Sequence, residues 1–115
     1  MPLIDNEARH RVRELNDAFQ KSLDPALGNM AMTSGVSSLP SDVRAMAIRK
    51  IATFDAFTAE NDPHGEHDFG GFDVVGRRFF FKIDHYDSSL EMVSGDPADP
   101  VKTTRVLTLM LAEEY

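Results

Sequence analysis

The sequence predicts a single α+β domain over residues 1–115, in which a small antiparallel sheet of three to four strands carries about three helices on one face. Apolar residues recur at three- and four-residue steps in the first half of the chain, whereas apolar and polar residues alternate over residues 79–86. A turn-forming run at residues 61–65 separates these two patterns. The length of 115 residues is typical of one domain with one core.

The first predicted helix covers residues 4–23 and is amphipathic, because its apolar side chains share one face. These side chains are Ile4, Ala8, Val12, Leu15, Phe19 and Leu23. Pro25 disfavours helical geometry at Asp24, and Gly28 tolerates left-handed dihedrals, so we expect the helix to end here. A short strand over residues 30–33 is expected to follow.

A second helix is predicted to begin after Ser41, a natural N-cap, and to run to about Thr58. Its apolar positions again follow helical spacing, at Val43, Ala47, Ile51, Phe54 and Phe57. The turn formers at residues 61–65 then end the helical half of the chain, and strands are expected from about His67.

The segment after His67 is rich in aromatic and β-branched residues and predicts a hairpin with its turn at residues 76–77. Alternation divides its second strand into two faces, one with Phe79, Phe81, Ile83 and His85 and the other with Phe80, Lys82, Asp84 and Tyr86. Residues 90–93 are predicted to form a third strand. We expect a core that contains Phe19, Phe54, Phe72, Phe79, Phe81 and Leu107.

The last segment is predicted as a helix that Asp99 caps, that Pro100 begins and that reaches Glu113. Residues 106–111 leave this helix almost no polar side, which indicates deep burial or a homodimer formed through the helix. The β-branched residues in this run are also compatible with a strand.

The composition restricts the classes of function. The chain has no cysteine, which excludes disulfides, thiol nucleophiles and cysteine-ligated metals and favours a reducing compartment. Its first residues do not have the pattern of a signal peptide, and no run approaches the roughly 20 apolar residues of a membrane span. We expect a cytoplasmic protein that makes no membrane contact.

The negative charge is concentrated in the middle of the chain, because residues 55–99 hold eleven acidic and only three basic residues. Such a segment repels phosphate backbones, so we expect no direct contact with nucleic acid and instead a basic protein or nucleoprotein partner. The residues expected to bind this partner are Glu60, Asp62, Glu66, Asp68, Asp84, Asp87 and Glu91.

A local cluster of His64, Glu66, His67 and Asp68 supports an alternative function, a metal-dependent hydrolase in which Asp84 or Asp87 adds a ligand or base. In an extended chain, however, Glu66 and Asp68 point to one side and His67 to the other. We therefore expect Asp62 or Asp68 to accept backbone hydrogen bonds in a turn, and we expect neither a bound metal nor another cofactor.

The paired charges of Lys82 and Asp84 and the basic cluster around Arg9 and Arg13 are both interpreted as solvent-facing groups. The short signatures of phosphate-binding loops, nucleophile elbows, zinc proteases and dinucleotide-binding folds do not occur in the sequence. No catalytic residue is predicted.

Four runs in the second half of the chain follow one another in order: NDPHGEHDFG (residues 61–70), KIDHYD (82–87), DPADP (96–100) and RVLTLMLAEEY (105–115). Together they resemble an uncharacterised bacterial family catalogued as domain of unknown function 3768, and the resemblance covers about residues 11–115. The resemblance implies no established activity and no catalytic residue. It implies an accessory role on plasmids and other mobile elements, against host defence systems. His85 stands where the family leads us to expect tyrosine.

These observations favour a non-enzymatic binding or accessory protein that presents an acidic surface to a basic partner. Its concrete form would be an inhibitor of host defence, of the anti-restriction or anti-CRISPR type, that mimics the charge of nucleic acid. A dimer with a housekeeping role is a third hypothesis.

Overall fold

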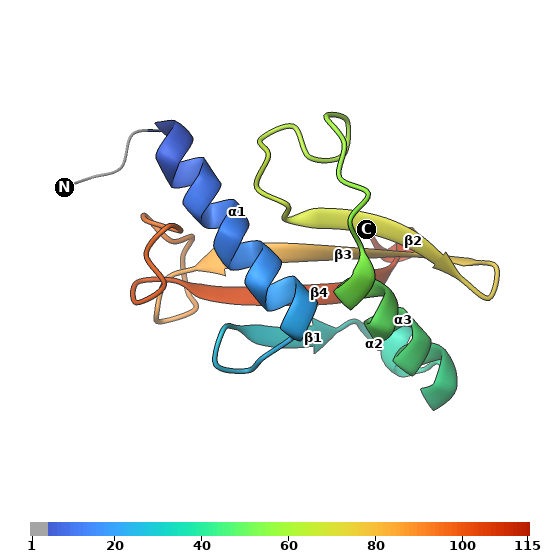
Figure 1. Cartoon of the computed structure of the whole chain (residues 1–115). Coiled ribbons are helices and arrows are strands. Elements are labelled where there is room, and N and C mark those ends of the chain that lie inside the picture. Colours follow the sequence, from blue (N-terminus) through green and yellow to red (C-terminus); the bar gives the residue numbers. More distant parts are fainter. Residues whose placement is uncertain (1–4) are drawn as a thin grey trace.

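The computed structural model describes residues 5–115, which form a four-stranded sheet with three α-helices and a short 3-10 helix (Figure 1). In chain order the elements are α1 (Asp5–Ser22), β1 (Asn29–Met32), α2 (Ser34–Ser37), α3 (Ser41–Thr53), β2 (Phe69–Val74), β3 (Arg77–Tyr86), β4 (Thr104–Leu111) and η1 (Ala112–Glu114). The predicted α+β class is confirmed. No helix within this part of the chain is long and apolar enough to cross a membrane.

The strands lie in the order β1-β4-β3-β2. β3 pairs antiparallel with both β2 and β4, whereas β1 runs parallel to β4. The sheet is therefore mixed, which corrects the expectation of a purely antiparallel sheet. Strands as far apart in the chain as β1 and β4 need no hairpin between them, so either direction is sterically open to them.

The core lies between the sheet and the helices α1 and α3, which cover the same face of the sheet (Figure 1). The structure buries most of the predicted core residues, namely Phe19, Phe72, Phe79, Phe81 and Leu107. Phe54, predicted with them, is only half-buried because it follows the last turn of α3 in an extended conformation. The side of the sheet that faces away from α1 and α3 is called the outer face below.

The hairpin of β2 and β3 has the predicted buried face, since Phe72 pairs with Phe79 and both point into the core. Its turn lies one residue earlier than predicted. Val75 and Gly76 both have positive φ angles, 52° and 73°, which is the geometry of the tight turns that follow the twist of the strands.

The predicted final helix is wrong, because residues 104–111 form the strand β4. β4 lies between β1 and β3, so it is covered on both edges, and Leu107, Leu109 and Met110 are buried. Its inner-face residues Leu107, Leu109 and Leu111 are buried, whereas Val106 and Thr108 on the outer face are only half-buried. Because Val106 and Met110 on the outer face are also apolar, residues 106–111 show no clear alternation of apolar and polar residues. The lack of a polar side in residues 106–111, which suggested a buried helix, is thus a property of this strand. Because the final helix does not form, a homodimer through that helix loses its structural basis.

The helix boundaries also differ in detail. Ile4, which began the predicted first helix, lies outside the described residues. α1 ends at Ser22, and Leu23 has a φ angle of 51°. Ser41 is the first residue of α3 rather than its cap, and the cap position Pro40 makes no side-chain hydrogen bond.

Two further predictions, the end of the second helix and the third strand, are wrong. α3 stops at Thr53 rather than near Thr58, because the chain becomes extended at Phe54. Residues 90–93 do not form a strand, since the positive φ of Leu90, 62°, interrupts the extended chain and only Val93 makes an isolated bridge to Tyr86.

Candidate functional site

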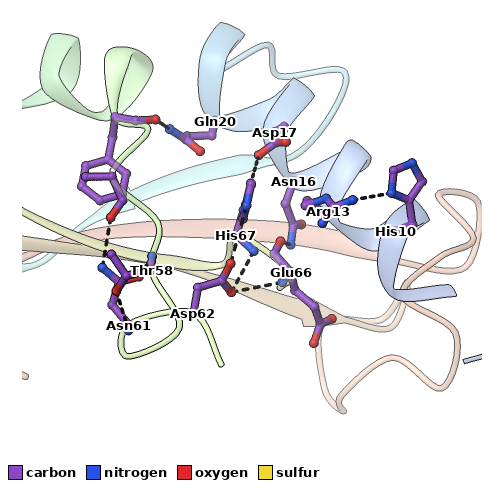
Figure 2. Close-up of polar contacts among 12 residues, drawn as sticks. His10, Arg13, Asn16, Asp17, Gln20, Thr58, Asn61, Asp62, Glu66 and His67 are labelled. Carbon is purple, nitrogen blue, oxygen red and sulfur yellow. Dashed lines mark hydrogen bonds and ion pairs between the residues drawn. The ribbon is translucent and has the colours of Figure 1, made fainter. Parts of the chain in front are cut away.

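The acidic loop before β2 is organised by Asp62, whose side chain is only 5% exposed. Its Oδ1 accepts hydrogen bonds from the backbone N–H groups of Glu66 (3.0 Å) and His67 (3.1 Å) (Figure 2). The predicted turn role of an aspartate in this loop is thus confirmed for Asp62. Because this carboxylate is buried and engaged, it contributes to the shape of the loop rather than to an accessible acidic surface.

His67 attaches the same loop to α1. Its Nδ1 donates a hydrogen bond to Asp17 Oδ1 (2.8 Å), and its Nε2 lies 3.6 Å from Asp62 Oδ2 (Figure 2). The ring also stacks on Phe57 with the ring centroids 3.9 Å apart. These contacts direct His67 toward the helix, whereas His64 is exposed and lines a cavity on the outer face. Within residues 5–115 no group of three or more His, Asp or Glu side chains could hold a metal ion.

Glu66 is half-buried beside α1, and its backbone oxygen accepts a hydrogen bond from Asn16 Nδ2 (2.9 Å). Burial raises the pKa of its carboxyl group, and the nearby charge of Asp68 raises this pKa further. Glu66 is not among the residues that line the cavity beside the outer face.

Three of the predicted partner-binding residues come together around one cavity of about 500 Å³ beside the outer face. Glu60 comes from the loop after α3, Asp68 from the residue before β2, and Asp84 from β3. We call this space the acidic cavity. It is lined by Glu60, Asn61, Pro63, His64, Asp68, Phe69, Lys82, Ile83, Asp84 and Tyr115.

The carboxylates of this cavity are only partly neutralised. Lys82 Nζ lies 3.2 Å from Asp84 Oδ2, and both side chains are partly exposed. Burial raises the pKa of Asp68, and the charges of Asp62 and Asp84 raise it further against the opposing effects of a backbone hydrogen bond and His64. A raised carboxyl pKa indicates that the negative charge is unfavourable where it stands, so an additional cation would stabilise it.

Two aromatic side chains, Phe69 and Tyr115, line the acidic cavity on the outer face. Phe80 packs against both of them, and the three ring centroids lie 5.1 to 5.6 Å from one another. Tyr115 is 75% exposed. The guanidinium of Arg78 stands 5.8 Å from the centre of the Phe80 ring, so this face already holds one cation against an aromatic ring.

The remaining predicted residues, Asp87 and Glu91, lie in the turn after β3 and do not line the acidic cavity. Asp87 Oδ1 accepts hydrogen bonds from Ser89 Oγ (2.7 Å), Ser89 N (3.1 Å) and Glu91 N (3.3 Å). The hydrogen bond from the Ser89 hydroxyl is the main cause that lowers the pKa of Asp87. Glu91 is exposed.

A buried polar group under α1 was not predicted. Asn16 Oδ1 accepts hydrogen bonds from Arg105 Nε (2.7 Å) and from His85 Nε2 (3.1 Å). Because an arginine Nε can only donate, the atom that faces it must be the amide oxygen, and His85 must carry its proton on Nε2. The sequence gives only a weak signal for this buried polar group. Arg105 is a single charge beside a run of apolar residues, and His85 lies on the buried face of β3.

The predicted partner-binding residues also did not include the aromatic residues of the acidic cavity, Phe69 and Tyr115. Phe69 reaches it because alternation directs this side chain to the outer face, opposite Phe72. Tyr115 follows the turn η1, and nothing in the sequence places it next to Phe80.

Residues 32–114 match the model of a family described as protein of unknown function, DUF3768. The match spans the four sequence runs that carried the resemblance, apart from Tyr115, and begins within β1. No curated protein and no solved structure matches the chain.

Proposed function

Since the chain belongs to the DUF3768 family of proteins of unknown function, we propose from its own surface that it is a non-enzymatic binding protein. The acidic cavity accepts a lysine or arginine side chain from a basic segment of a partner protein. The observation that carries this proposal is the convergence of Glu60 and Asp68, from the loop between α3 and β2, and Asp84, from β3, on one cavity beside the outer face.

The charge of the cavity supports a cationic occupant. Glu60, Asp68 and Asp84 bring three carboxylates, and Lys82 stands close to Asp84. Glu60 and Asp68 make no ion pair with any other described residue. A partner cation would therefore find carboxylates that are not already paired, and it would relieve the unfavourable charge of Asp68.

The aromatic wall supports a long side chain rather than a free ion. Lysine and arginine carry an apolar stem below the charged group, and this stem packs well on aromatic surfaces. Phe69 and Tyr115 supply such a surface beside the carboxylates. The cation itself gains a further attraction where it stands over a ring face.

In its finer form, the proposal makes this partner a nucleic-acid-binding protein of a host defence system, such as a restriction or CRISPR component, and places both proteins in the bacterial cytoplasm. The acidic excess of residues 55–99 would imitate the charge of a phosphate backbone and occupy the partner's basic groove. The family resemblance to proteins of mobile elements favours this class of partner.

The test uses an oligolysine peptide and isothermal titration calorimetry with the intact protein. We expect binding that weakens as salt is added, because exposed charges are screened over about 10 Å at 0.1 M salt. The Glu60→Lys variant should lose about tenfold in affinity, which corresponds to about 1.4 kcal/mol, because it places a cation in the acidic cavity.

The matched control is Glu91→Lys, which changes the net charge equally at an exposed site outside the cavity. It should bind the peptide nearly as well as the unchanged protein. Equal losses in the two variants would assign the binding to overall charge and refute the cavity as the site. For the finer proposal, a basic host protein should co-purify with the unchanged protein and not with Glu60→Lys.

A further inference from the structure

Arg105 is a charged residue inside the protein, and only 3% of its surface is exposed. Its Nε donates to Asn16 Oδ1 at 2.7 Å, and its Nη2 donates to the backbone oxygen of Pro97 at 2.5 Å. Both acceptors are neutral. Within the described part of the chain, no carboxylate lies within ion-pairing distance of this guanidinium.

This arrangement leaves a buried positive charge without a counter-charge. The pKa of Arg105 is lowered to about 10, chiefly by burial and also by the charge of Arg11, while the charge of Glu66 opposes both effects. A buried charge is costly unless it is paired, and in folded proteins such charges are normally matched by a carboxylate or by a bound ion.

A cavity of about 280 Å³ borders Arg105 where the loop after α1 meets the loop before β4. Its volume is close to the lower end of the range of small-molecule sites, about 300–1,000 Å³. It shares no residue with the acidic cavity. The lining residues are Leu15, residues 25–29, Pro100, Thr103, Thr104 and Arg105.

We propose that this cavity binds a small molecule through an oxyanion, a carboxylate or phosphate group, with Arg105 as the cation that anchors it. Guanidinium presents its donors in a planar fork that matches two oxygens of either group. Nη1 of Arg105 makes no hydrogen bond with another described residue, so one edge of this fork remains free for the ligand. The site is independent of the proposed binding of a basic partner.

The experiment titrates the unmodified, isotope-labelled protein with inorganic phosphate and, separately, with acetate, at constant ionic strength adjusted with sodium chloride. Backbone amide resonances are followed by NMR. We expect saturable shifts concentrated at residues 26–29 and 101–105. The thermal midpoint should rise by several degrees at about 100 times the dissociation constant. A response to phosphate alone, to acetate alone or to both supports the site and identifies the group that it prefers.

Two variants locate the effect. Arg105→Gln should abolish the saturable shifts, and Arg77→Gln, which removes an exposed arginine at the far hairpin, should leave them unchanged. If Arg105→Gln does not fold, the shift pattern of the unmodified protein decides the question. The proposal is refuted if neither anion produces saturable shifts, or if the shifts lie at the exposed arginines of α1 instead.

Discussion

At the scale of single residues, Asp62 shows how one carboxylate can organise a loop of turn-forming residues. The loop before β2 has few apolar side chains to hold it, so its backbone depends on hydrogen bonds from Asp62 and on the attachment of His67 to α1. The position of Asp68 in the acidic cavity, one residue after His67, follows from this arrangement. Asp62 thus holds the shape of the loop, whereas Asp68 lines the acidic cavity.

Removal of the Asp62 carboxylate should destabilise the protein. Asp62→Ala leaves the N–H groups of Glu66 and His67 without their acceptor, and an unsatisfied buried polar group costs about 1–3 kcal/mol. Urea unfolding followed by circular dichroism measures this change. Asp62→Asn keeps an oxygen acceptor at the same place and should retain most of the stability. An unchanged midpoint for Asp62→Ala would contradict the role assigned to this side chain.

His85 predicts how stability depends on pH. Burial lowers its pKa from 6.5 to about 4, Arg105 adds to this effect, and Asp84 opposes it. The unfolded chain, with the ordinary pKa, binds the proton first as the pH falls. The stabilising contribution of neutral His85 is therefore complete above about pH 6.5 and decreases toward pH 4. Allowing for the partial exposure of the ring, we expect a loss of the order of 2 kcal/mol.

The measurement compares chemical unfolding of the unchanged protein and of His85→Gln between pH 7 and pH 4. Glutamine retains an amide N–H for Asn16 and does not titrate, so this variant should lack the contribution of His85. The carboxyls of Glu66 and Asp68, whose pKa values are raised, stabilise the folded protein on acidification and act equally in both proteins. Parallel pH curves would show that His85 is not buried in its neutral form.

At the scale of elements, β3 was predictable and β4 was not, for one physical reason. β3 has a buried face and a face that holds Lys82 and Asp84, so alternation marks its register. β4 has apolar residues on both faces, Val106 and Met110 on one and Leu107, Leu109 and Leu111 on the other, so no clear period distinguishes it from a buried helix. The parallel pairing of β1 with β4 joins residues 77 positions apart, such as Asn29 and Val106, and leaves no local signal.

The assignment of the two faces of β3 can be tested with neighbouring residues. Phe81 is fully buried against Phe54, whereas Phe80 is half-buried on the outer face. Phe81→Ala should destabilise the protein by about 3–5 kcal/mol because it opens a cavity in the core. Phe80→Ala, its matched control, should cost clearly less in the same denaturant titration. A larger loss for Phe80→Ala would mean that the faces are reversed.

At the scale of the whole molecule, the sequence predicted an acidic surface from residues 55–99 but not the site within it. Glu60, Asp68 and Asp84 meet only because the loop after α3 folds back beside β2 and β3. Asp62, from the same acidic segment, is instead buried. Charge counts along the chain predict a net field, whereas burial and hydrogen bonding decide which carboxylates remain accessible. Neither the charge count nor the apolar pattern of the sequence predicts the buried Arg105, because its position depends on the contact of β4 with α1.

The central place of β4 has a consequence for synthesis of the protein on the ribosome. β1 and β3 both emerge before the strand that must lie between them. Until residues 104–111 leave the exit tunnel, the nascent chain has apolar strand edges with unpaired backbone groups, which are the features that chaperones and proteases encounter in incomplete proteins. A message truncated before the codons for residues 104–111 would therefore yield a chain that cannot assemble this sheet. The sheet can therefore close only after residues 104–111 have been synthesised.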